Sequence, residues 1–179
     1  MASASPEILN PGSPLAQLGE VAFFSGRLEE AKSLLGKSLG TLGSHDLIFI
    51  AMAQTDLAEI ALAQKDLLQA HHWLEHAYEY ACQQIRRMLV FLCALAGYHV
   101  LLGKDTSNLI KAAQLYGAIE SLGAKSGVNF NSFYRRLNQE RMQLAREKLT
   151  ATEWQAAYET GRGWERDEAI LQAKNLLGI

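Results

Sequence analysis

Apolar residues recur at helical spacing on both sides of a short polar turn, Gln64-Lys65-Asp66, near the middle of the chain. Before the turn they form one stripe, and after it a facing stripe: Leu57, Ala58, Ala61 and Leu62, then Leu67, Ala70, Leu74 and Ala77. The small residues Ala58 and Ala70 allow the two helices to approach at the short end of the usual ~8–10 Å interaxial range. The pattern therefore predicts a helical hairpin.

The same template occurs once before and once after this hairpin. The small residue of the first helix falls at Gly19, Ala58 and Ala96, in steps of 39 and 38 residues. The small residue of the second helix follows 12, 12 and 16 residues later. Three copies of one hairpin predict a helical-repeat protein, because each copy needs a neighbour to bury its apolar face.

The distribution of proline supports an all-α fold. All three prolines lie within the first fourteen residues, and no segment alternates apolar and polar residues as a strand does. We expect a flexible leader over residues 1–12, the repeat region over residues 13–127, and C-terminal helices over residues 128–179. Repeat spacing divides the middle region at about 13–43, 44–83 and 84–127, with a helix break near Ala81–Ile85.

The repeats resemble the tetratricopeptide repeat (TPR). They share its pattern of Leu-Gly/Ala-x-x-Ala followed by Ala-x-x-x-Leu-x-x-Ala, although they are longer than the usual 34 residues and lack the family's closing proline. The resemblance implies a TPR-like superhelical solenoid of three helical hairpins, closed by C-terminal capping helices. It also implies a non-enzymatic module for protein–protein interaction.

The C-terminal third resembles the end of the repeat region in LuxR- and MalT-type transcription regulators, which also contain an ATPase domain. In those proteins an Ala-Ala-x-Leu-x-Gly-Ala helix precedes a helix with Tyr and Arg, a Trp-x-x-Ala-x-x-x-Gly-Arg segment and a Glu-Ala-Ile helix. The matching positions are Gly117, Tyr134, Trp154, Gly161, Arg162, Glu168, Ala169 and Ile170. The resemblance implies a regulatory or sensor region in transcription regulation and signal transduction. From the residues themselves, Thr150 and Glu153 predict a capping box at a helix start.

Composition and charge narrow the class of partner. A net charge of −2 argues against nucleic acid as the main partner, because neutralising phosphates needs a basic surface. Cys82 and Cys93 lie in apolar helical runs and are expected to be free thiols in a reducing compartment. Because we find neither a signal peptide nor an apolar run of ~18 residues, we expect a cytoplasmic protein with no membrane partner.

Two short motifs suggest chemistry, but each has a simpler explanation. Residues 31–38 (AKSLLGKS) resemble a phosphate-binding loop, yet that loop must follow a strand, and this segment is itself predicted to be helical. His72, Glu75 and His76 match the H-x-x-E-H pattern of zinc peptidases, with the two histidines one helical turn apart. No further metal ligand is identifiable, so a solvent-facing polar helix is preferred.

The helix near 130–149 carries five basic residues with Glu140 and Glu147 interleaved among them. We expect this helix to present a solvated charged face. No nucleophile–base constellation is visible, so we predict no catalytic site, no cofactor and no metal. A metal-dependent hydrolase using the H-x-x-E-H motif, and a nucleic-acid binder using the 130–149 helix, remain the alternatives.

The partner-binding surface is expected on the concave face, which the first helix of each TPR-like repeat lines. The exposed stripe would run through Ala16, Glu20, Phe23, Thr55, Asp56, Glu59, Leu62, Cys93, Gly97 and Val100. Because it combines three acids with apolar residues and no base, we expect a protein or peptide partner with an apolar segment and a basic flank. The alternative is that the leader or the C-terminal helices fill this groove.

Overall fold

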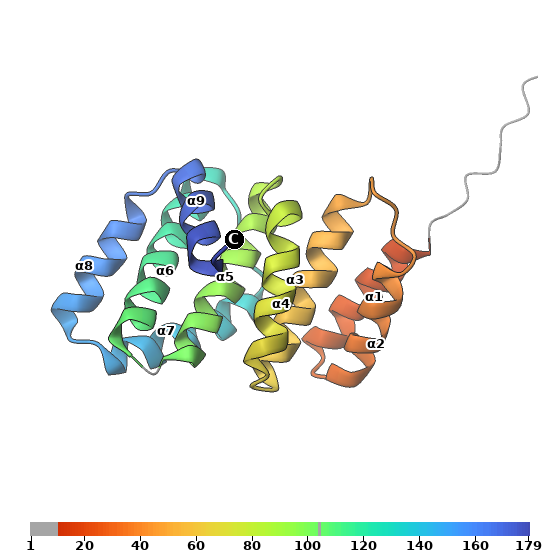
Figure 1. Ribbon diagram of the computed structural model, residues 1–179, viewed down its shortest axis with the longest axis horizontal. Coiled ribbons are helices and arrows are strands. Elements are labelled where there is room, and N and C mark those ends of the chain that lie inside the picture. Colours follow the sequence, from red (N-terminus) through yellow and green to blue (C-terminus); the bar gives the residue numbers. More distant parts are fainter. Residues whose placement is uncertain (1–10, 104) are drawn as a thin grey trace, which may run out of the picture.

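The computed structural model describes residues 11–103 and 105–179. These residues form nine α-helices and no strand, which confirms the all-α prediction (Figure 1). The helices are α1 (Gly12–Phe24), α2 (Leu28–Leu39), α3 (Leu47–Ala63), α4 (Leu67–Ala81), α5 (Ile85–Leu102), α6 (Thr106–Ser126), α7 (Ser132–Lys148), α8 (Ala151–Arg162) and α9 (Arg166–Leu177).

The first six helices pack in consecutive pairs. α1 packs most extensively with α2, α3 with α4, and α5 with α6, and three residues separate the helices of each pair in the sequence. The expected break is confirmed, since α4 ends at Ala81 and α5 begins at Ile85. The first helix begins at Gly12, with Pro11 in the N-cap position. Most of the expected leader, residues 1–10, lies outside the described residues.

Helices α3 and α5 form the centre of the core. Every residue from 51 to 62 and from 88 to 97 is buried, because these helices are apolar on nearly all sides and have packing partners on more than one face. Ala58 and Ala70 are both fully buried, as the hairpin pattern predicts. By length and composition α5 could also span a bilayer, so the expectation that no segment could do so is wrong, although most of α5 is buried inside the protein.

The C-terminal helices cover the last pair. α6 and α8 run in the same direction in Figure 1, and α7, which connects them in the chain, lies along the lower edge of the view, next to α5 and α6. α6 and α8 meet at two glycines: a Cβ atom on Gly117 would lie 2.0 Å from the Tyr158 carbonyl oxygen, and one on Gly161 only 1.7 Å from that of Gln114. α8 begins with the predicted capping box of Thr150 and Glu153.

Candidate functional site

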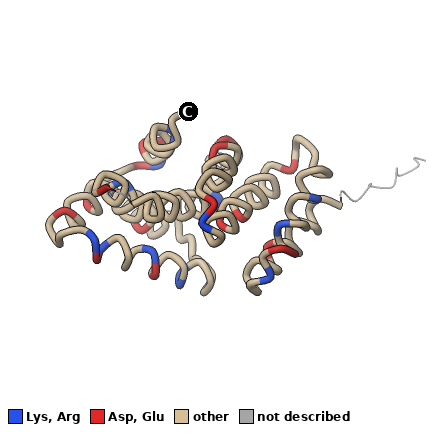
Figure 2. Tube along the Cα trace, turned by 60° about the horizontal axis from the view of Figure 1, so that its bottom comes forward, with Lys and Arg blue, Asp and Glu red and all other residues tan. Residues whose placement is uncertain are grey.

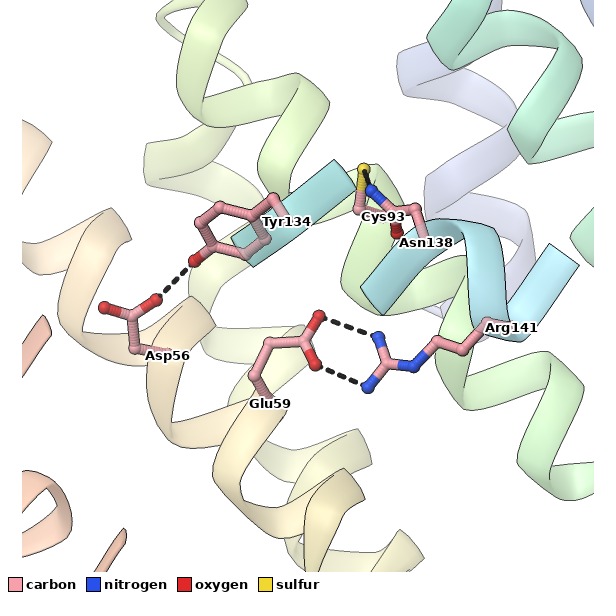
Figure 3. Close-up of polar contacts among 6 residues, drawn as sticks. All are labelled: Asp56, Glu59, Cys93, Tyr134, Asn138 and Arg141. Atoms are coloured by element: carbon pink, nitrogen blue, oxygen red, sulfur yellow. Dashed lines mark hydrogen bonds and ion pairs between the residues drawn. The ribbon is translucent and has the colours of Figure 1, made fainter. Parts of the chain in front are cut away.

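The stripe expected to line an open groove is inside the protein. Asp56 and Glu59 are each 1% exposed, and Glu20 is half-buried. The other seven positions of the expected stripe are also buried: Ala16, Phe23, Thr55, Leu62, Cys93, Gly97 and Val100. The prediction that these residues are exposed is wrong, because α7 lies across α3 and α5 and covers the acidic part of the stripe (Figure 3).

One face of α7 supplies the covering side chains. Tyr134, Asn138 and Arg141 follow one another at spacings of four and three residues, which places them on the same side of the helix. Each is buried and has a buried partner on α3 or α5, as Figure 3 shows. α7 is therefore joined to the inner helices by polar contacts in an otherwise apolar core.

The strongest of these contacts is a bidentate ion pair. Arg141 Nη1 and Nη2 donate to Glu59 Oε1 and Oε2 at 2.9 and 2.6 Å, and the two side chains are 9% and 0% exposed. Burial works against the charged guanidinium, but the Glu59 carboxylate outweighs it, so the pKa of Arg141 is raised. Gly97 provides the space, since a Cβ atom there would lie 2.4 Å from Arg141 Nη1. The sequence-based expectation that the basic side chains of this helix are solvated is therefore wrong for Arg141.

Asp56 receives a single hydrogen bond. Tyr134 Oη donates to Asp56 Oδ1 at 2.7 Å, while Oδ2 has no hydrogen-bond partner among the described residues. Burial, reinforced by the nearby Glu20 carboxylate, raises the pKa of Asp56 to about 8. At neutral pH this carboxyl group is therefore mainly protonated, so it adds little negative charge to the interior.

The third contact involves a cysteine. Asn138 Nδ2 donates to Cys93 Sγ at 3.0 Å. Burial raises the pKa of the Cys93 thiol to about 12, so the group stays protonated and is a poor nucleophile. Cys93 and Cys82 are both free, as expected.

An apolar groove remains open beside α7. It has a volume of about 310 Å³ and lies between α7 and the helices α1 to α3. Its lining is mainly apolar and includes Phe23, Leu28, Leu62, Phe133, Leu137 and Leu144, of which Leu144 is 46% exposed. Aromatic contacts close one end, where the Phe133 ring lies 4.9 Å from those of Phe23 and Phe24. Three of the expected partner-binding residues, Phe23, Glu59 and Leu62, thus line an accessible groove.

The two motifs that suggested chemistry both lie on helices, α2 and α4. Residues 31–38 belong to α2, and Ser38 is buried with its Oγ donating to the Gly12 carbonyl oxygen at 2.7 Å. His72 and His76 lie together on α4, whereas Glu75 pairs with His71 instead. No group of three metal-ligating side chains converges within residues 11–103 and 105–179.

Charged residues do not gather into a single basic surface. Figure 2 shows Lys and Arg interspersed with Asp and Glu over many helices, α7 among them. Within α7, Arg136 Nε lies 3.9 Å from Glu140 Oε1, and Arg141 forms its buried ion pair with Glu59. The described residues therefore lack the continuous positive face that phosphate binding requires.

Sequence reasoning missed the roles of Tyr134, Asn138 and Arg141. Their common face on the helix was visible in the spacing, but their partners are 45 to 82 residues away in the chain. A useful signal was the near absence of charge on α3, whose only charged residues are Asp56 and Glu59. A helix that is apolar all round is normally covered, so these two acids required buried partners.

No family model, curated protein sequence or solved structure matches the chain.

Proposed function

We propose that the chain is a non-enzymatic protein–protein interaction module with a TPR-like superhelical arrangement of three helical hairpins and C-terminal capping helices. The recurring small residues Gly19, Ala58 and Ala96 support this proposal, and so do the three consecutive helix pairs. The resemblance of residues 112–173 to LuxR- and MalT-type regulators extends the proposal to a regulatory or sensor region.

The observation that carries the proposal is the apolar groove between α7 and α1 to α3. Apolar pockets of this kind accept side chains of a docked peptide or helix. The groove offers aromatic rings at one end and the partly exposed Leu137 and Leu144 along α7. The proposed partner is therefore a protein segment that inserts apolar side chains between α7 and the helices α1 to α3.

The structure gives less support than the sequence for a basic flank on the partner, because the acids that were expected to attract it are paired within the chain. All three acids of the stripe are engaged within the chain: Glu59 with Arg141, Asp56 with Tyr134, and Glu20 with Arg87 at 3.7 Å. They do not offer a negative surface to steer a basic partner. The proposal retains the apolar segment and leaves out the charge requirement.

The test is a comparison of two leucine substitutions in a pull-down from the source cell, followed by binding measurements with the purified partner. Leu144→Glu places a charge in the groove at a partly exposed position, so it is expected to weaken binding at least ~10-fold while the chain stays folded. Leu68→Glu is the matched control, because Leu68 is 85% exposed on α4 and does not line the groove. Equal binding by the wild type and Leu144→Glu would place the interface elsewhere.

A further inference from the structure

Two histidines on α4 lie side by side on the surface. His72 and His76 are both exposed, and their ring centroids are 4.2 Å apart. Residues four apart on a helix project from the same face, so the pair is held by backbone geometry rather than by a flexible loop. Helix α4 in turn is anchored by Ala70, Leu74 and Ala77, which are fully buried. The two imidazoles therefore occupy a preorganised position.

A hydrogen bond fixes which nitrogen of His76 is available. His76 Nδ1 lies 2.8 Å from the His72 carbonyl oxygen. Because a carbonyl oxygen only accepts hydrogen bonds, Nδ1 carries the hydrogen, and the lone pair of the neutral ring is on Nε2. Metal-bound histidines in proteins commonly use this arrangement, in which a backbone carbonyl orients the ring and sets its tautomer.

The surroundings offer two ligands rather than three. Glu75, the acid of the H-x-x-E-H motif, has its Oε1 3.6 Å from His71 Nδ1. In the part of the chain that the structure describes, no third His, Cys, Asp or Glu completes a group with the pair. The arrangement does not match a zinc peptidase centre, which needs at least three protein ligands.

We propose that His72 and His76 form a two-histidine chelating site for a borderline divalent transition-metal ion such as Ni²⁺, Cu²⁺ or Zn²⁺. Imidazole nitrogen suits these ions, whereas Mg²⁺ and Ca²⁺ require oxygen ligands. Water molecules complete the coordination of the bound ion. The metal joins two successive turns of α4, so it stabilises the folded chain by RT ln(1 + M/Kd), where M is the free metal concentration.

The site is independent of the proposed partner groove. Neither histidine lines the groove beside α7, so loss of metal binding and loss of partner binding are separate results. Of the other histidines, His71 faces Glu75 and Tyr98, and His99 is buried with Nδ1 3.2 Å from Asn108 Oδ1.

The experiment is calorimetric titration of the full chain, made without a polyhistidine tag, with NiCl₂. The wild type is expected to bind one Ni²⁺ ion. His72→Gln and His76→Gln should each weaken binding at least ~10-fold, because either change leaves a single imidazole. At a Ni²⁺ concentration of ~100 times Kd, the Tm of the wild type should rise by about 5–10 °C, and that of each variant much less.

His71→Gln is the matched control, since it removes the neighbouring histidine and leaves the pair intact. It is expected to bind Ni²⁺ as the wild type does. Absence of one-to-one binding by the wild type would overturn the proposal, and so would wild-type affinity in His72→Gln or His76→Gln. Loss of binding in His71→Gln would overturn it too, because the ligands would then be His71 and Glu75.

Discussion

At the scale of single residues, the contacts between α7 and the inner helices join groups that are costly to bury alone. Glu59 lies among apolar side chains on α3, and the Arg141 guanidinium neutralises its carboxylate. Breaking a buried ion pair by removing one partner costs far more than replacing both partners by apolar groups. The pair therefore specifies where α7 docks, since any other position of the helix leaves both charges uncompensated.

We expect Arg141→Met to lower the free energy of unfolding by ~3–5 kcal/mol, because Glu59 would stay buried without its counter-charge. The double variant Glu59→Met with Arg141→Met removes both charges and should lose much less stability. Urea unfolding of the wild type, the single variant and the double variant measures the difference. A double variant as unstable as Arg141→Met would show that packing, rather than charge compensation, makes Arg141 important.

Asp56 should make stability depend on pH. Its pKa rises from 3.8 to about 8 on folding, mainly through burial, so the folded state holds a proton that the unfolded state releases. Its contribution to stability is fully present below about pH 4 and is lost as pH rises through about 8. Asp56→Asn keeps an oxygen that can accept from Tyr134 and has no proton to lose.

The measurement for Asp56 is Tm at pH 5 and pH 8.5 for the wild type and Asp56→Asn. The variant should gain stability relative to the wild type as pH rises. His99 does not affect the comparison. Burial lowers its pKa to about 4, so its contribution to stability is lost only as pH falls through about 4, and both proteins contain this histidine. A difference in Tm that is the same at both pH values would show that Asp56 does not ionise differently on folding.

At the scale of helices, local sequence patterns were sufficient to predict where helices begin and end. They were insufficient to predict contacts between residues far apart in the chain. The turn at residues 64–66 and the break between Ala81 and Ile85 could be predicted, because turn residues and repeat spacing act over a few positions. The burial of Ala58 and Ala70 followed from the same spacing. The position of α7 could not be predicted, because nothing near Glu59 in the sequence identifies Arg141, 82 residues away, as its partner.

The crossing of α6 and α8 depends on glycine at the point of contact. A Cβ atom on Gly161 would meet the backbone of Gln114 at 1.7 Å, so Gly161→Ala must push the two helices apart. We expect a loss of ~3 kcal/mol or more in the free energy of unfolding, at the upper end of typical overpacking costs.

Gly36→Ala is the matched control for Gly161→Ala. Gly36 also lies within a helix, α2, but a Cβ atom there meets nothing within 4 Å. It should gain ~0.5–1 kcal/mol from helix propensity alone. Urea unfolding of both variants separates the cost of the crossing from the intrinsic preference for alanine. Equal effects at the two positions would mean that α6 and α8 do not approach closely.

At the scale of the whole molecule, the chain covers its inner helices with its own C-terminal third. α7 crosses α3 and α5, α8 packs on α6, and α9 contacts α4 and α6. Trp154, Trp164, Ala169 and Ala173 of this region belong to the same apolar core as α5 and α6. An array of helical hairpins otherwise ends in an exposed apolar face, so its terminal elements must present a polar outer side.

A chain that ends at Leu149 lacks α8 and α9 and should therefore expose the apolar face of α6. Large exposed apolar patches promote association, so we expect the truncated chain to aggregate and to unfold at a lower temperature than the full chain. Size-exclusion chromatography with light scattering, together with thermal unfolding, measures both effects. Removal of Ile179 alone is the control, because this residue is 46% exposed and its loss should change neither property. A chain ending at Leu149 that stays monodisperse and equally stable would show that α1 to α7 close their own core, and that α8 and α9 serve another purpose.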